Sequence, residues 1–589
     1  MLRHLWGVAL LAGAPAAWGQ ALPDATLPVP SRIRLLEHGT SIEGGTRAGP
    51  NLLHSFAAFS VPSGDRVEFA AQDGIQNILA RVTGSLPSQL DGTLAVAGTA
   101  RLILLNPNGI RFGNSAQLEI SGTLVATTAE RVVLADGQAF GVGATPLLSV
   151  AVPLGVQFGT QAAPLTAGGP GAVRSDRPLF QGDDLGEPLN LGQGLTAGGL
   201  HLIGGSLMLD GALLQATEVA LVAGSPQSRV SLGALPVVQG GQGDVVLRNN
   251  ALVYTEGGPL SVQGQNVGLL EGSRLESRIA NQDGSPIVVQ VQDTLTATGR
   301  SPNAGGAERY VGGIVTTSEL RGTGNVGPLT VAAQTIRLGD GGSPIADTFG
   351  LGKAGAIALT ATQKLVAQDA GRISSSAPRA FGQGNNIAIK ADTVHLQNGF
   401  QVTAIARGAN ARGEVTPGNI AVQARTLTVE GVQPGTDFPS GFFTSSLGGS
   451  IADAGNIKVV TDRLYLRQGG QINSQAGSFG TGSAGSIDIV ARERVELEGL
   501  AAGEIPSGMF VVVEPFSFGN AGRITLTTPI LQMNDRAEIS VGSNTEFTTS
   551  TGGIPNGIGA AGSLEIRAGE TVLDGGGRNG GGEPRQPSN

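Results

Sequence analysis

Short alternating strands separated by polar turns dominate the chain from about residue 250 onward. Each unit begins with a glycine, continues with a strand whose apolar residues alternate, and ends in a polar turn, as in GNIKVVTDRLYLRQGGQINS from Gly455. Alternation at every second residue indicates strands with one buried face and one wet face, and helical periodicity is nowhere sustained. The strands open at spacings of about 30 to 40 residues, at Ile357, Ile387, Ile420, Ile457, Ile487, Ile524 and Leu564.

This repeat predicts a solenoid. A preserved strand unit with variable spacing indicates constant rungs joined by loops of variable length. A parallel β-helix satisfies the pattern, because every strand pairs with those above and below while alternate side chains stack inside. A β-sandwich would need tight Asn-Gly hairpins between alternating strands, and these are sparse. We therefore predict an all-β, right-handed parallel β-helix with an N-terminal cap and two or more rungs in each repeat.

The expected shape is a rod. At roughly 20–25 residues a rung and a strand spacing of 4.7–4.9 Å, about 550 ordered residues predict about 25 rungs and a length of roughly 110–130 Å. The segment around Ile33 to Phe56 is expected to cap one end. The last rung, around Leu564 to Leu573, is expected to keep an open edge.

The composition supports a solenoid and argues against nucleic acid as a partner. Of 589 residues, 94 are glycine and only 4% are aromatic, which is too few to fill several compact cores. The formal net charge is −9, only four lysines occur, and no basic run exists, so nucleic acid is not a predicted partner. Cysteine is absent, which excludes disulfides and thiolate metal sites.

The candidate chemical sites all have simpler explanations. Three Gly-x-Gly-x-x-Gly patterns, from Gly322, Gly480 and Gly557, match the dinucleotide-binding fingerprint, but strands rather than helices follow them, which predicts corner turns. The acidic group Asp183, Asp184 and Glu187 lies between glycines and predicts a solvated loop. The histidines of the mature chain, which are His38, His54, His201 and His395, are far apart in sequence. His54 alternates with Phe56, which predicts core or cap packing. We predict no metal, no cofactor and no catalytic residues.

The first residues read as an export signal. Arg3 and His4 precede an apolar run over residues 5–14, and Ala17 and Gly19 occupy the small positions of a cleavage site before Gln20. The run is far shorter than the roughly 20 residues that span a membrane. Residues 1–19 are therefore predicted to be a signal peptide.

Several motifs between residues 49 and 205 resemble one protein family. They are Asn51-Leu52-Leu53-His54-Ser55-Phe56, Arg81-Val82-Thr83-Gly84, Asn106-Pro107-Asn108-Gly109-Ile110, Ala126-Thr127-Thr128-Ala129, Val152-Pro153-Leu154-Gly155-Val156-Gln157-Phe158-Gly159 and Leu202-Ile203-Gly204-Gly205. Together they resemble the secretion domain of two-partner-secretion exoproteins of the filamentous-haemagglutinin family, particularly its cyanobacterial branch. The resemblance covers roughly residues 25–235. The second Asn-Pro-Asn-Leu motif of some other branches is not found here.

The Asn106–Ile110 motif predicts a rigid corner. Asn106 can cap a type I turn, Pro107 presets φ, Asn108 completes the turn and Gly109 lets the chain leave, so that Ile110 re-enters the core. Such a corner would set strand register. The resemblance implies in addition that this region is recognised by the periplasmic modules of an outer-membrane transporter.

These observations predict four segments: a signal peptide (1–19), a secretion domain (25–235), a β-helical repeat region (236–574) and a disordered tail (575–589). The expected function is that of a structural or adhesive protein, secreted or on the cell surface of a Gram-negative-type bacterium after passage through the periplasm. A host or neighbouring-cell surface, or an extracellular polysaccharide, would be its target. The alternative is a secreted carbohydrate-active enzyme with a pectin-lyase-like β-helix. Both tryptophans lie within residues 1–19, which disfavours sugar binding. A contact-dependent toxin is disfavoured because the tail, GGGRNGGGEPRQPSN, predicts no globular module.

We expect the secreted protein to begin at Gln20, because Ala17 and Gly19 fit the cleavage site. N-terminal sequencing of material recovered outside the cell tests this. An intact Met1 on exported protein would contradict it.

Overall fold

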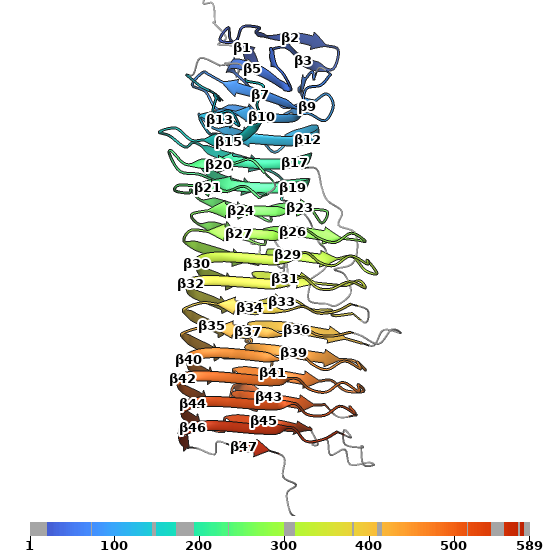
Figure 1. Cartoon of the computed structure of the whole chain (residues 1–589), viewed down its shortest axis with the longest axis vertical. Coiled ribbons are helices and arrows are strands. Elements are labelled where there is room, and N and C mark those ends of the chain that lie inside the picture. The colour runs from blue at the N-terminus through green and yellow to red at the C-terminus, as the bar shows by residue number, and fades with distance from the viewer. Residues whose placement is uncertain are drawn as a thin grey trace, which may run out of the picture.

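The computed structural model describes residues 21–71, 73–143, 149–171, 194–233, 235–299, 312–379, 382–408, 415–514, 516–543, 559–574 and 578–581. These residues form a rod of stacked coils that runs from the N-terminal end to the C-terminal end (Figure 1). Each coil contributes strands to three faces, and strands of successive coils pair in parallel. The predicted class, an all-β right-handed parallel β-helix with an N-terminal cap, is confirmed.

The first face holds sixteen successive strands within the described residues, joined by fifteen parallel pairings. They are β5 (Asn51–Ala58), β7 (Asn77–Val82), β10 (Arg101–Leu105), β12 (Gln117–Thr127), β17 (Leu195–Gly204), β19 (Leu213–Ala223), β24 (Leu260–Gly264), β27 (Ile287–Val291), β30 (Leu329–Gly339), β32 (Ile357–Gln368), β34 (Ile387–Lys390), β37 (Ile420–Gln423), β40 (Ile457–Arg467), β42 (Ser486–Glu498), β44 (Arg523–Asn534) and β46 (Ser563–Leu573).

The second face is built from shorter strands and from the ends of long first-face strands that bend round the corner. The short ones are β8 (Ser88–Leu90), β11 (Ile110–Phe112), β16 (Pro164–Gly168), β18 (Ser206–Asp210), β22 (Val245–Arg248), β25 (Val267–Leu269), β28 (Thr294–Thr298), β35 (Thr393–Gln397) and β38 (Thr426–Glu430). The carboxyl halves of β30, β32, β40, β42, β44 and β46 complete this face.

The third face is likewise built from short strands and from parts of longer strands. It comprises β3 (Gly39–Gly44), β6 (Arg66–Phe69), β9 (Thr93–Val96), the amino-terminal parts of β12, β17 and β19, and then β23 (Leu252–Thr255), β26 (Arg274–Ile279), β29 (Gly313–Ser318), β31 (Ser343–Asp347), β33 (Arg372–Ser374), β36 (Gln401–Arg407), β39 (Gly441–Leu447), β41 (Gln471–Ala476), β43 (Gly508–Val513), β45 (Glu538–Ser543) and β47 (Arg578–Gly581). A short 3₁₀ turn, η1 (Ala502–Glu504), precedes β43.

The sequence repeat is one coil of this structure. Ile357 pairs with Ile387, Ile387 with Ile420, and the series continues without a break to Ile524 and Leu564. The prediction of two or more rungs per repeat is therefore wrong. Each coil contains strands on three faces together with its corner loops, so a coil consumes the whole repeat of about 30 to 40 residues.

The rod is consequently shorter than predicted. Fifteen steps at the usual strand spacing of 4.7–4.9 Å give a stack of about 70–75 Å. The expected 25 rungs and 110–130 Å assumed too few residues in the loops.

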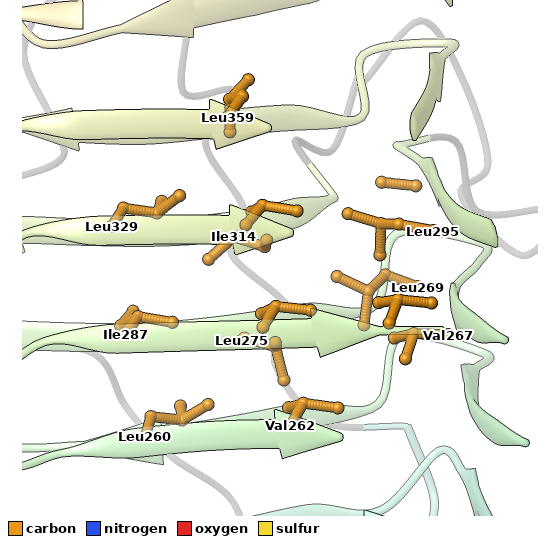
Figure 2. Close-up of a cluster of buried hydrophobic side chains, with 14 of the residues drawn as sticks. Leu260, Val262, Val267, Leu269, Leu275, Ile287, Leu295, Ile314, Leu329 and Leu359 are labelled. Carbon is orange, nitrogen blue, oxygen red and sulfur yellow. The ribbon is translucent and has the colours of Figure 1, made fainter. Parts of the chain in front are cut away.

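Aliphatic side chains fill the interior as continuous stacks. Leu260, Ile287 and Leu329 are direct neighbours in successive coils and are fully buried (Figure 2). Like residues stack because parallel pairing places the same position of each coil over its predecessor. This stacking explains how the chain forms one long core with few aromatic residues.

Close packing of corner backbones requires glycine at particular positions. A Cβ on Gly324 would overlap the carbonyl oxygen of Gln282 in the preceding coil, and one on Gly482 would overlap that of Ala452. Both glycines belong to patterns that resemble the dinucleotide fingerprint. Their place between strands agrees with the predicted corner turns, and no helix follows either of them.

The two ends of the rod differ. At the N-terminal end, β2 (Ser31–Leu36) pairs antiparallel with β3, while β1 (Leu22–Pro23) and β4 (Thr46–Ala48) pair antiparallel with β5. This arrangement covers the first coil, so the cap begins earlier than the predicted Ile33. At the other end, the inward positions of β46 are only partly buried. β47 lies within the predicted disordered tail and pairs with β45, so these four residues extend the third face.

We expect Ile457→Ala to lower the free energy of unfolding by about 2–5 kcal/mol, because it leaves a cavity between two stacked isoleucines. Lys458→Ala is the matched control: its side chain points to solvent, and the expected change is within about 0.5 kcal/mol. Urea titration with pulsed hydrogen exchange over β37, β40 and β42 measures both. Equal effects would contradict the inward assignment of Ile457.

Candidate functional site

The motifs singled out in the sequence meet at one corner of the rod. Register pairs Leu105 with Arg81 on one side and with Thr127 on the other, and Thr127 in turn with Ile203. The segments 81–84, 106–110, 126–129 and 202–205 therefore stack where the first face turns toward the second. We call this the corner stack. Motifs spread over more than a hundred residues thus form one continuous strip.

Asn106 organises the turn that was predicted from sequence. Its side chain is fully buried, and its Nδ2 donates to the Leu86 carbonyl and the Ser88 hydroxyl, both at 3.0 Å. Its Oδ1 accepts from the Asn108 backbone N–H at 3.0 Å. The Gly109 N–H closes the turn on the Asn106 carbonyl at 3.1 Å, with Gly109 at φ +120°. The amide thus joins one corner to the corner of the preceding coil.

Asn108 and its surroundings face outward. Asn108 is exposed, and its Nδ2 donates to the Gly84 carbonyl of the preceding coil at 2.7 Å. Leu86, beside it, has 52% of its surface exposed. Ile110 re-enters the core as predicted and is 2% exposed, while Pro107 is half-buried. The turn therefore presents an amide and an aliphatic side chain on a rigid support.

Arg81, a buried arginine of the corner stack, anchors the segment that follows β1. Arg81 is 2% exposed, and its guanidinium donates to the Ser55 hydroxyl at 3.0 Å and the Thr26 hydroxyl at 2.9 Å. It also lies 4.8 Å from the centre of the Phe140 ring. Burial lowers the pKa of Arg81, and the charge of Asp24 opposes that change.

Asp24 completes this network. Its carboxylate accepts from the hydroxyls of Ser55 at 2.8 Å and Thr83 at 2.7 Å. Burial raises the pKa of Asp24, but hydrogen bonds from Thr26, Thr83 and Ser55 outweigh burial and hold the pKa below its ordinary value. Sequence analysis did not find Asp24 or Phe140, because a motif shows neighbours along the chain and not those across it. The one signal in the sequence was Arg81 itself, because a charged residue within an apolar strand requires a polar or acidic partner.

A separate antiparallel sheet covers the outside of the first face here. Its strands, in spatial order, are β14 (Ala139–Gly141), β13 (Arg131–Leu134), β15 (Pro153–Gln157), β20 (Arg229–Ser231) and β21 (Val238–Gln239). Val132, Val156 and Phe158 pack on outward residues of the β-helix such as Ile103 and Val125. The predicted motif of residues 152–159 is the middle strand of this sheet. First-face strands of this region are therefore buried on both sides, which explains their unbroken apolar runs.

His54, His201 and His395 each have a different partner. His54 packs on Phe56 and Phe69 in the cap, with its Nδ1 2.9 Å from the Ser31 hydroxyl oxygen. Burial lowers the pKa of His54 to about 4. His201 lies 3.2 Å from Glu218, and His395 lies 2.8 Å from Glu430. Within the described residues, no three metal-ligating side chains are grouped to hold an ion.

Other predicted features fall outside the described residues. They are the cleavage site at Ala17, Gly19 and Gln20, the acidic group at Asp183, Asp184 and Glu187, and most of the tail. In the part of the chain that is described, no helix is long and apolar enough to cross a membrane.

Comparison with known proteins gives one family. Residues 19–293 match the family model of the TPS secretion domain. A solved structure, the HMW1 secretion domain from Haemophilus influenzae, aligns with 94% of this chain and 100% of that chain at 12% identity and a TM-score of 0.38. No curated protein matches the sequence.

We expect acid to destabilise the cap through His54. In the unfolded chain the imidazole gains a proton below about pH 6.5, whereas the folded cap keeps it neutral down to about pH 4. Stability is thus fully present above pH 6.5 and is lost as the pH falls toward 4, by about 3 kcal/mol at roughly 1.4 kcal/mol per pKa unit. His54→Gln cannot titrate and should flatten this dependence. Urea titrations between pH 7.5 and 4, with pulsed exchange of β3 and β5 amides, measure it. Identical pH profiles for both proteins would contradict the prediction.

Proposed function

We propose a structural or adhesive role for the mature form of this chain, which is a two-partner-secretion exoprotein with a TPS secretion domain at residues 19–293. Such a domain implies export across the outer membrane of a Gram-negative bacterium to the surface or the surrounding medium. It also implies contact with an outer-membrane transporter. We propose that the periplasmic modules of this transporter bind the corner stack.

The geometry of the corner stack supports this proposal. The Asn106 turn is braced by hydrogen bonds to the preceding coil, so Asn108 and Leu86 are held in fixed positions on the surface. A fixed site loses little conformational entropy on binding. The resemblance of this motif to the family's secretion signature is a second, independent support.

The secretion domain occupies only part of the rod. The family match ends at residue 293, beyond the predicted boundary at 235, and three-face coils continue without interruption across both positions. We propose that the coils beyond the secretion domain form the part that is displayed. Its target would be a host or neighbouring-cell surface or an extracellular polysaccharide. The residues before Gln20 would be removed as a signal peptide.

The alternative, a carbohydrate-active enzyme, gains no specific support. Glycoside hydrolysis generally needs a pair of carboxyl groups about 5 to 9.5 Å apart on either side of the scissile bond. The acidic group that sequence offered for this role, Asp183, Asp184 and Glu187, lies outside the described residues.

We expect Asn108→Ala to lower export several-fold while leaving the fold intact, because this exposed side chain makes two hydrogen bonds, each worth about 0.5–1.5 kcal/mol. Asn106→Ala should lower export further, since it removes a buried amide with several partners. The measurement is the secreted fraction of each variant in cells that make the partner transporter. Protease resistance of the purified protein reports folding.

Asn419→Ala is the matched control. Asn419 is an exposed corner asparagine of the repeat region, and its Oδ1 accepts from the Asn456 N–H at 2.8 Å. Its substitution should leave export unchanged. Wild-type export of both Asn106→Ala and Asn108→Ala would remove the role proposed for the turn.

A further inference from the structure

A groove lies on the outer surface of the third face, well beyond the secretion domain. Its volume is about 890 Å³, and outward residues of β33 and β36 form its floor, including Arg372, Ser374 and Thr403. Loop residues Gln433 and Phe438 and the β39 residue Leu447 line it as well. The lining therefore comes from four successive coils, those of β31, β33, β36 and β39, whose strands follow one another along the rod (Figure 1).

The charge of the groove is opposite to that of the whole chain. Among the described residues, its lining holds three arginines, Arg372, Arg379 and Arg407, and one carboxyl group, Asp347. The chain as a whole has a formal net charge of −9. A local excess of guanidinium groups favours an anionic ligand.

Asp347 supports the floor and is not presented to a ligand. It is 1% exposed, and its Oδ1 accepts from the Ser374 hydroxyl at 2.6 Å and the Ser376 N–H at 2.8 Å. Its other oxygen lies 3.4 Å from the Arg372 guanidinium. Burial raises the pKa of Asp347, against the charge of Arg372. The carboxyl group thus positions the arginine from beneath.

Arg407 is the exposed cation of the groove. It ends β36, and the stem of its side chain passes close to Gly448, where an added Cβ would lie 3.2 Å from the Arg407 Cγ. Among the described residues, no ion pair or side-chain hydrogen bond of Arg407 is formed. Its guanidinium can therefore pair with a carboxylate of a ligand through two parallel hydrogen bonds.

The rest of the lining suits a ligand rich in hydroxyl groups. Gln401, Thr403 and Gln433 supply amides and a hydroxyl, and the Gln401 Nε2 already donates to the Pro439 carbonyl at 3.1 Å, which fixes its amide. Phe438 stands at the groove with 61% of its surface exposed. An exposed aromatic ring beside fixed polar groups is a common arrangement for orienting a small polar ligand.

Aromatic side chains continue the surface along the rod. The rings of Phe479 and Phe516 stack at 5.2 Å with an interplanar angle of 3°, and Phe479 is 71% exposed. Both residues have positive φ, +65° and +63°, which is strained for bulky side chains and is often retained for function. Phe479 follows β41, whose adjacent Gly477 lies against Leu447 of the groove. The rings therefore extend the same surface toward the C-terminal end.

We propose that this groove and the adjoining rings bind an acidic polysaccharide, with Arg407 pairing a uronate carboxylate and Phe438 stacking on a sugar ring. A polymer fits because the lining extends over successive coils and further exposed rings follow in the coils beyond. The inference rests on the proposed adhesive function and names its target class.

The groove is suited to binding and not to hydrolysis. Asp347 is the single carboxyl group among its described lining residues, and it is covered. Hydrolysis generally uses two accessible carboxyl groups, one as acid and one as base or nucleophile.

Calorimetry on the purified mature chain tests the proposal. A galacturonic-acid hexamer should bind, and its fully methyl-esterified form should bind at least tenfold more weakly. Arg407→Gln should weaken binding of the acid hexamer about 10- to 100-fold, as expected for a charge-assisted hydrogen bond. Phe438→Ala should weaken it about 3- to 10-fold. Because the chain is purified, these results do not depend on export.

Arg463→Gln is the matched control. Arg463 is a half-exposed arginine on the second face, 2.5 Å from Glu493, and its replacement changes net charge equally. It should leave the affinity unchanged. The proposal is overturned if the hexamer does not bind at millimolar concentration, if Arg463→Gln weakens binding as much as Arg407→Gln, or if hexaglutamate binds as tightly as the sugar acid.

Discussion

Parallel pairing of each coil with the coils on either side is the interaction on which this structure depends. The pairing places equivalent positions directly over one another, so a buried isoleucine in one coil requires an aliphatic residue in the next. It also brings corner backbones so close that a side chain such as one on Gly324 or Gly482 would collide with a carbonyl oxygen. The repeated strands, the glycine content and the scarcity of aromatic residues all follow from this constraint.

The same constraint allows local additions without disturbing the stack. Loops leave at the corners, and the longest described addition forms an antiparallel sheet that packs on the outside of the first face. That sheet gives the N-terminal half two hydrophobic layers, one inside the coils and one outside. The cap adds a third element, in which Arg81 and Asp24 tie the N-terminal strand to the first coils. The N-terminal half is therefore the more extensively supported part of the rod.

The two candidate binding surfaces use this support in different ways. At the corner stack, a buried asparagine braces a turn and thereby holds the exposed residues beside it in place. In the groove, a buried aspartate braces an arginine from beneath. In both places a buried polar residue holds an outward side chain in position through its hydrogen bonds, so that the outward side chain loses little conformational entropy when a partner binds.

The sequence by itself determined the fold class, the repeat and the corner at Asn106. Alternation at every second residue reports which face of a strand is buried, and the residues of a tight turn are neighbours along the chain. Only the tertiary structure decided how many strands make a coil, because loop length does not reveal where a chain closes on itself. It also decided that four separate motifs form one strip, that Asp24 meets Arg81 and Thr83, and that Arg407, Phe438 and Asp347 share a groove. Those residues lie one coil or more apart, and the register between coils, which brings them together, depends on stacking energies summed over the whole rod.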